Sequence, residues 1–146
     1  MDDWRANLIE DREGGYRVLR ESRRVAVLGI KTEERSDQPA FFVPEYLQHA
    51  GYEIVPVPVY HPEATEILGE RVYRRLVDIP GDVDLVVVFR RSHDIPPHVP
   101  DILAKAPRAV WFQAGIRNDA AAEELARGGI QVVQDRCTMV ELQMMR

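Results

Sequence analysis

Short, unbroken runs of apolar residues recur along this chain. Val25 to Ile30 is such a run, and it is too short for most helices. Apolar positions without alternation are typical of strands that are covered on both faces of a parallel sheet. The sequence therefore predicts buried strands at residues 25–30, 52–57, 84–89, 109–112 and 130–133, with a brief further strand at 71–73.

Apolar positions between these strands follow helical spacing. Pro39 suits a first helical position, and the apolar residues from Phe42 to Ala50 share one helical face. Pro44 is expected in the first turn, where its missing amide is tolerated, and Gly51 ends this helix. Further helices are predicted in the proline-rich segment 93–105 from about Pro97, at 119–127 after an Asn118 N-cap, and in the tail 135–146.

The first 22 residues are predicted to be helical. Trp4, Leu8 and Ile9 fall on one side of a short helix at 4–13, which Gly14 and Gly15 would stop, and residues 16–23 would add a turn. Downstream, strands alternate with helices, which predicts right-handed crossovers. The expected fold class is α/β, a three-layer, doubly wound parallel sheet.

Size and charge limit the classes of function that are open to this chain. The 146 residues, 45% apolar and 29% charged, predict one domain, with a helical extension at 1–22 and a core at 23–146. A net charge of −5 argues against nonspecific electrostatic binding to nucleic acid or acidic lipid. The acidic start lacks the apolar core of a signal peptide or membrane span. The single cysteine, Cys137, excludes an internal disulfide and is expected to be a half-buried or buried thiol. One thiol suits a cytoplasmic protein. Assembly into a homo-oligomer is compatible with these features.

Ligands of an open parallel sheet bind outside the carboxyl ends of its strands. That rule selects the segments 29–36, 57–61, 89–93 and 113–117, which should line one crevice. Five cations lie in these segments on an otherwise acidic chain: Lys31, Arg35, Arg90, Arg91 and Arg117. The sequence therefore predicts an anionic ligand.

The common phosphate-binding motifs fit poorly. A nicotinamide dinucleotide fingerprint needs G-x-G-x-x-G and a carboxylate about 20 residues later, whereas only Gly29 is present and Pro58 and Val59 follow the second strand. No Walker loop occurs. The nearest histidine pair, His93 and His98, straddles two prolines with no cysteine close by, which speaks against a metal site.

Five ordered motifs carry a resemblance to a known family. They are VAVLGIK (25–31), PAFFVPEYLQHAGYEIVPV (39–57), ILGERVYRRLVDIPGDVDLVVVFRRS (67–92), AVWFQAGI (109–116) and DRC (135–137). Together they resemble the small single-domain CoA-binding proteins, which are similar to the CoA-binding domain of the succinyl-CoA synthetase alpha subunit. The resemblance covers about residues 16–140 and implies a Rossmann-like domain that binds coenzyme A in the crevice.

Residue roles follow from that resemblance. The loop of Gly29, Ile30 and Lys31 would meet the CoA phosphates. Arg35 is a further candidate contact because of its place in the same loop, independently of the resemblance. The adenosine would be flanked by Val57, Pro58, Val59, Phe89, Arg90 and Arg91, and the crevice floor would be bordered by Gln113, Gly115 and Ile116. The family usually reads PVNP after the second strand, whereas this chain reads PVPV and continues with the longer insertion YHPEATE.

The leading hypothesis is non-catalytic binding of CoA or an acyl-CoA. In the resembled synthetase the phosphorylated histidine belongs to a second domain, which has no counterpart here. An NAD(P)-dependent oxidoreductase or a nucleotide-sensing redox protein is the alternative. A third hypothesis is an interaction module that packs on a partner through Met139, Met144 and Met145.

Overall fold

A six-stranded parallel sheet forms the centre of the molecule. The computed structural model describes residues 3–145. The sheet has the order β1-β8-β7-β6-β2-β3, and every neighbouring pair is parallel, as the sequence predicts. The strands are β1 (Leu8–Ile9), β2 (Arg24–Leu28), β3 (Glu53–Val57), β6 (Leu85–Val88), β7 (Ala109–Phe112) and β8 (Gln131–Val133).

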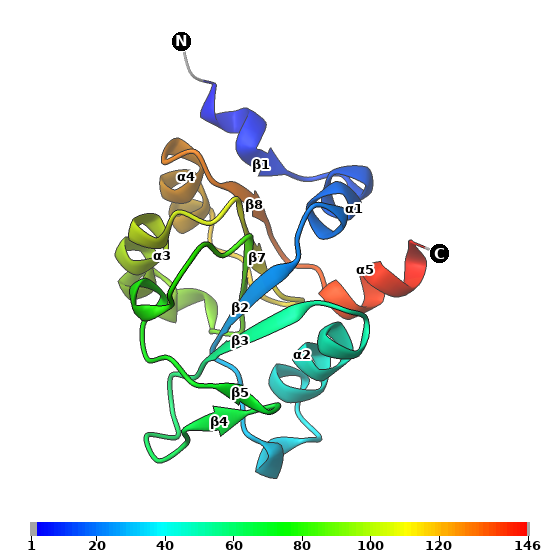
Figure 1. The fold of residues 1–146 in the computed structure, drawn as a ribbon. Coiled ribbons are helices and arrows are strands. Elements are labelled where there is room, and N and C mark those ends of the chain that lie inside the picture. The colour runs from blue at the N-terminus through cyan, green and yellow to red at the C-terminus, as the bar shows by residue number, and fades with distance from the viewer. Residues whose placement is uncertain (1–2, 146) are drawn as a thin grey trace.

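Helices cover both faces of this sheet, so the predicted three-layer α/β architecture is confirmed (Figure 1). One face carries α1 (Arg12–Arg20), α2 (Pro39–His49) and α5 (Thr138–Met144); the other carries α3 (Val99–Lys105) and α4 (Asp119–Arg127). Single 3₁₀ turns are η1 (Trp4–Asn7), η2 (Glu33–Arg35), η3 (Leu76–Asp78), η4 (Ser92–Asp94) and η5 (Pro96–His98), and a small hairpin is formed by β4 (Glu66–Ile67) and β5 (Glu70–Arg71). No helix within residues 3–145 has the length and apolar character to cross a membrane.

Alternate residues of the central strands belong to two separate hydrophobic cores, one on each face of the sheet. In β2, Val25 and Val27 pack with α1 and α2, whereas Ala26 and Leu28 pack on the side of α3 and α4. Both sides are shielded, so each strand is apolar throughout and no alternation appears in the sequence. This two-sided burial is the physical reason why the unbroken runs predicted the strands correctly.

The predicted helix over residues 4–13 is wrong. This segment forms η1 and then β1, which pairs with β8, and Gly14 and Gly15 lie inside α1 rather than at a helix end. A Cβ at Gly14 would lie 2.5 Å from Ile9 Cγ2, and one at Gly15 would lie 3.4 Å from the Trp111 ring. The two glycines therefore let α1 pack directly on the sheet, which outweighs their low helix propensity.

Pro44 also lies elsewhere than predicted. Helix α2 begins at Pro39, which places Pro44 in its interior instead of its first turn. A proline has no amide, so it cannot bond to the carbonyl four residues earlier, that of Ala40. The amide of Lys31 donates to this carbonyl oxygen instead, at 3.1 Å. The proline thus leaves an acceptor that anchors the loop after β2 to α2.

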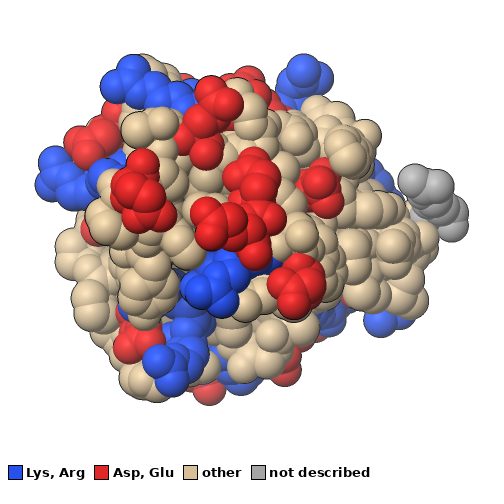
Figure 2. Space-filling model, turned by 90° about the horizontal axis from the view of Figure 1, so that it is seen from below, with Lys and Arg blue, Asp and Glu red and all other residues tan. Residues whose placement is uncertain are grey.

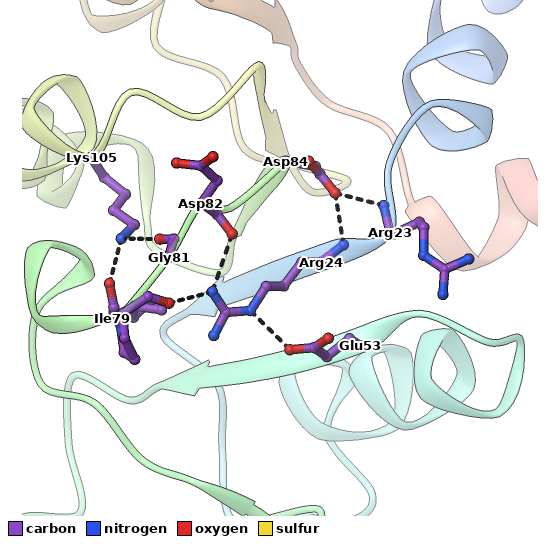
Figure 3. A network of polar contacts seen from close by, with 9 residues as sticks. Arg23, Arg24, Glu53, Ile79, Gly81, Asp82, Asp84 and Lys105 are labelled. Carbon is purple, nitrogen blue, oxygen red and sulfur yellow. Dashed lines mark hydrogen bonds and ion pairs between the residues drawn. The ribbon is translucent and has the colours of Figure 1, made fainter.

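Polar contacts fasten the amino edge of the sheet (Figure 3). The Asp84 carboxylate accepts from the amides of Arg23 and Arg24, both at 2.9 Å, and the Arg24 side chain pairs with Glu53 at 2.8 Å. Burial raises the pKa of Asp84, but donation by the two amides together with the charges of Arg108 and Arg23 outweighs it, so the pKa lies below its ordinary value. Lys105 donates to two carbonyl oxygens of the turn before β6. This edge of the sheet is therefore stabilised by contacts within the protein.

Candidate functional site

The carboxyl edge has its switch point between β2 and β6. From β2 the chain crosses to β3 on one side, and it later returns to β6 on the other side of β2. The connections that follow β2 and β6 therefore run in opposite directions along the sheet, which leaves an opening between the ends of these two strands. The strands are parallel, so the loops after β2, β3, β6 and β7 all lie at this edge, as expected for segments 29–36, 57–61, 89–93 and 113–117.

Gly29 has a different role from the predicted one. Its φ is +89°, and its amide donates to the Val57 carbonyl oxygen at 2.8 Å, so this amide is already used within the sheet. A Cβ at this position would collide with the Phe89 carbonyl oxygen. The sequence predicts that the amides of Gly29 and Lys31 donate to phosphate. Both amides instead donate within the protein, that of Gly29 to Val57 and that of Lys31 to Ala40. Glycine is required here so that the ends of β2 and β6 can approach each other.

Cationic side chains at this edge gather around Tyr60. The Lys31 ammonium lies 4.8 Å from the Tyr60 ring centroid, and the Arg90 guanidinium carbon lies 5.6 Å from it. Arg90 Nη1 also donates to the Tyr60 hydroxyl at 3.3 Å. This hydrogen bond, and then the positive charge of Arg90, lower the pKa of the Tyr60 phenol. Three strand ends, those of β2, β3 and β6, thus contribute one side chain each to a cluster that we call the Tyr60 cluster.

Arg90 and Arg91 differ sharply in their surroundings. The Arg90 side chain is 15% exposed, and its Nε donates to His98 Nε2 at 3.2 Å. The Arg91 side chain is 78% exposed and lies 3.6 Å from Asp94. Asp94 also lies 3.9 Å from Arg90. Of the two predicted arginines, Arg90 is therefore the one that the fold orients.

His98 is held in its neutral form. Its Nε2 accepts from Arg90, so in the neutral ring the proton resides on Nδ1. Burial and then the charge of Arg90 lower the pKa of His98, and the carboxylates of Asp101 and Asp94 oppose this shift. The imidazole thus serves as an acceptor that orients Arg90.

The His98 shift predicts a loss of stability in acid. The unfolded chain takes up a proton near pH 6.5, whereas folded His98 does so at lower pH, so the free energy of unfolding falls as the pH drops through this interval. His98→Gln retains an acceptor but does not titrate, and it should show a shallower fall. Urea unfolding of both proteins between about pH 7.5 and pH 5 measures the difference. Parallel pH profiles would contradict the role given to His98.

Two cavities open on either side of the contact between Arg90 and His98. The first, of about 660 Å³, lies between the ends of β2 and β3 and helix α3; its wall includes Leu28, Pro58, Val59, Arg74, Arg75, His98 and Asp101. The second, of about 530 Å³, lies between the start of α2 and the loops after β6 and β7; its wall includes Pro39, Ala40, Phe89, Arg90, Gly115 and Ile116. Because His98 lines one cavity and Arg90 lines the other, their hydrogen bond joins the two walls.

The remaining predicted site residues divide between the core, the surface and the wall of the second cavity. Ile30 and Val57 are buried core side chains, and Arg35 is exposed on η2. Gln113 is 3% exposed, and its side-chain oxygen accepts from the amide and the hydroxyl of Thr138. The Gly115 amide donates to Asp135 at 2.6 Å. The structure therefore brings Lys31 and Arg90 together at Tyr60 and gives Gln113 a structural contact with α5. Of the other predicted site residues, Pro58 and Val59 line the first cavity, and the second is lined by Phe89, Arg90, Arg91, Gly115 and Ile116.

Sequence reasoning missed Tyr60, His98 and Asp94. Tyr60 lies in the predicted segment 57–61, and an aromatic residue just after a strand end was the available signal. His98 was weighed only as a metal ligand. Cys137 is half-buried, as predicted, and among the three tail methionines only Met144 is strongly exposed, at 49%.

The chain as a whole is similar to proteins of a known family. Residues 23–143 match the family described as CoA binding domain. The uncharacterised protein YneT of Bacillus subtilis (strain 168) is 36% identical over 123 residues, which cover 84% of this chain and 87% of YneT.

Solved structures agree with this match. The protein called cell-free ID.343 from Thermus thermophilus is 35% identical with a TM-score of 0.84, covering 93% of this chain and 99% of its own. A hypothetical protein from Pyrococcus horikoshii OT3 is 28% identical with a TM-score of 0.81, covering 92% and 91%. The family match spans most of the chain, so the predicted resemblance is confirmed: this protein belongs to the CoA-binding-domain family.

Proposed function

We propose that the protein binds coenzyme A or an acyl-CoA, without catalysing a reaction, as one cytoplasmic domain. The diphosphate would lie beside Lys31 and Arg90, the adenosine in the first cavity and the pantetheine arm in the second. The observation that carries this proposal is the position of Arg90, a partly buried cation at the switch point with a cavity on either side. A ligand with an anionic centre and two dissimilar arms fits this layout.

Charge supports an anionic ligand at this place. The chain has a net charge of −5, and acidic side chains gather in the middle of the face seen in Figure 2, around a smaller basic group. Attraction must therefore come from local cations rather than from the overall field. Lys31 and Arg90 supply it at the strand ends, and Arg74 and Arg75 line the first cavity.

The end of β3 favours CoA over a nicotinamide dinucleotide. Dinucleotide-binding sheets place a carboxylate after the second strand to bind the ribose hydroxyls. Here Pro58 and Val59 occupy that position and line the first cavity, while the Gly29 amide is used by Val57. An apolar surface beside two arginines suits an adenosine that carries an additional phosphate.

Asp101 and His98, two titratable residues in the wall of the first cavity, are already hydrogen-bonded within the protein, which supports a binding role. Both Asp101 oxygens accept backbone amides, from Leu76 at 2.8 Å and from Val77 at 3.2 Å. His98 accepts from Arg90. A general base must be free to take a proton from the substrate. These groups instead maintain the walls of the cavities.

Titration calorimetry with CoA, acetyl-CoA, NAD and ATP tests the proposal. We expect saturable binding of CoA and acetyl-CoA at one site per chain, markedly tighter than that of NAD. Acetyl-CoA should be recovered intact after incubation. Binding of NAD without binding of either CoA species would overturn the ligand assignment, and turnover of acetyl-CoA would overturn the non-catalytic role.

A further inference from the structure

Tyr60 follows directly after Pro58 and Val59, and it contacts both cations at the switch point. Its ring lies against Lys31 and Arg90, and its hydroxyl accepts from Arg90. We propose that Tyr60 is a positioning residue that holds Lys31 and Arg90 as a two-point clamp for a diphosphate rather than for a single phosphate. This inference rests on the proposed function and specifies which part of the ligand is recognised.

The backbone that carries Tyr60 is restrained. The side chain of Arg74 donates to three carbonyl oxygens of the following loop, those of His61 at 3.0 Å, Pro62 at 3.1 Å and Ala64 at 2.7 Å. His61 has a φ of +64°, a conformation that a non-glycine residue adopts only when its surroundings require it. Tyr60 therefore stands on a braced turn, although its side chain is 53% exposed.

Both cations approach the ring from anchored positions. Lys31 is fixed at its amide by the Ala40 carbonyl that Pro44 leaves without a helical donor. Arg90 is fixed at its guanidinium by His98 and lies near Asp94. An aromatic face attracts cations, so the ring limits the rotamers of two long side chains that would otherwise lose entropy on binding. The anchored backbones and the shared ring together make a pre-organised pair.

The charge balance of the cluster calls for more than one negative charge. Asp94 lies 3.9 Å from Arg90 and 3.6 Å from Arg91, and within residues 3–145 Lys31 makes no ion pair, so three cations share one carboxylate. Two cations against one ring repel each other, and a ligand that contacts both relieves that repulsion. A diphosphate carries charge on two adjacent groups and can contact one cation with each. A monophosphate offers only one such group.

The comparison of ADP with AMP isolates this contribution, because the two ligands share the adenosine and the first phosphate. For the wild-type protein we expect ADP to bind about tenfold more tightly than AMP, since one charge-assisted contact is added. Tyr60→Leu should reduce this ratio to near one. Tyr60→Phe keeps the ring and should retain most of it. Arg71→Gln, which removes a cation from the Tyr73 ring outside both cavities, is the matched control and should leave the ratio unchanged.

Several outcomes separate this inference from the proposed function. Thermal unfolding first shows that Tyr60→Leu is folded, and the ratio is insensitive to a uniform loss of binding. A Tyr60→Leu protein that keeps the wild-type ratio would overturn the clamp. So would a wild-type protein that binds CoA but does not distinguish ADP from AMP, and in that case CoA binding itself stands. A wild-type protein that binds no CoA would overturn the proposed function and the clamp with it.

Discussion

Replacement of Arg90 by glutamine is expected to lower the affinity for CoA by about 10- to 100-fold. Hydrogen bonds to charged groups contribute roughly 1.5–3 kcal/mol each, and Arg90 is the cation that the fold places between the two cavities. Its side chain is 15% exposed, so the interaction with a phosphate would be weakly screened by solvent. Titration calorimetry with CoA at constant ionic strength measures the effect.

Two arginine variants serve as comparisons for Arg90→Gln. Arg71→Gln removes the same charge on β5, outside both cavities, and should leave CoA affinity unchanged. Arg91→Gln removes a side chain that is 78% exposed and should have a much smaller effect than Arg90→Gln. If Arg90→Gln and Arg71→Gln bind CoA equally well, Arg90 has no part in the site.

Replacement of Gly29 by alanine is expected to lower the free energy of unfolding by about 2–5 kcal/mol. The φ of +89° is unfavourable for alanine by roughly 1–2 kcal/mol. The added methyl group would also collide with the Phe89 carbonyl oxygen, and relieving such overpacking typically costs about 1–3 kcal/mol. Both terms weaken the junction of β2 with β6. Urea unfolding of the variant and the wild-type protein gives the difference.

Gly129 provides the matched control for this substitution. Its φ of +87° is nearly that of Gly29, but no atom lies within 4 Å of a Cβ added there. Gly129→Ala should therefore show only the backbone cost of about 1–2 kcal/mol. Equal losses for Gly29→Ala and Gly129→Ala would mean that the close approach of Phe89 has no energetic weight.

The loop after β3 carries the residue that links the two cations. The chain continues from β3 through Val59 and Tyr60 into a loop that Arg74 stabilises. This loop places an aromatic ring against the two cations at the neighbouring strand ends. A segment outside the central sheet thus contributes a side chain to the Tyr60 cluster.

The sequence by itself determined the parallel sheet, five of its six strands and the edge at which the four candidate loops lie. Strands buried on both faces must be apolar at every position, so the runs at 25–30, 84–89 and 109–112 were recognisable without any knowledge of their neighbours. Parallel strands bring their carboxyl ends to one edge, so the four candidate loops followed from the order of the elements. The family motifs lie on these strands and on the loops that join them.

Only the tertiary structure decided which residues of those loops meet. The two-residue strand β1 is too short for any periodicity and forms by pairing with β8 at the far end of the chain. The loop residues Arg90 and Arg91 are adjacent and identical in type, yet His98 orients only the first. The sequence predicts a ligand contact at Gly29, whereas the structure shows the Phe89 carbonyl oxygen, from the end of another strand, against this position. Each of these outcomes depends on contacts between residues distant in sequence, which local pattern does not encode.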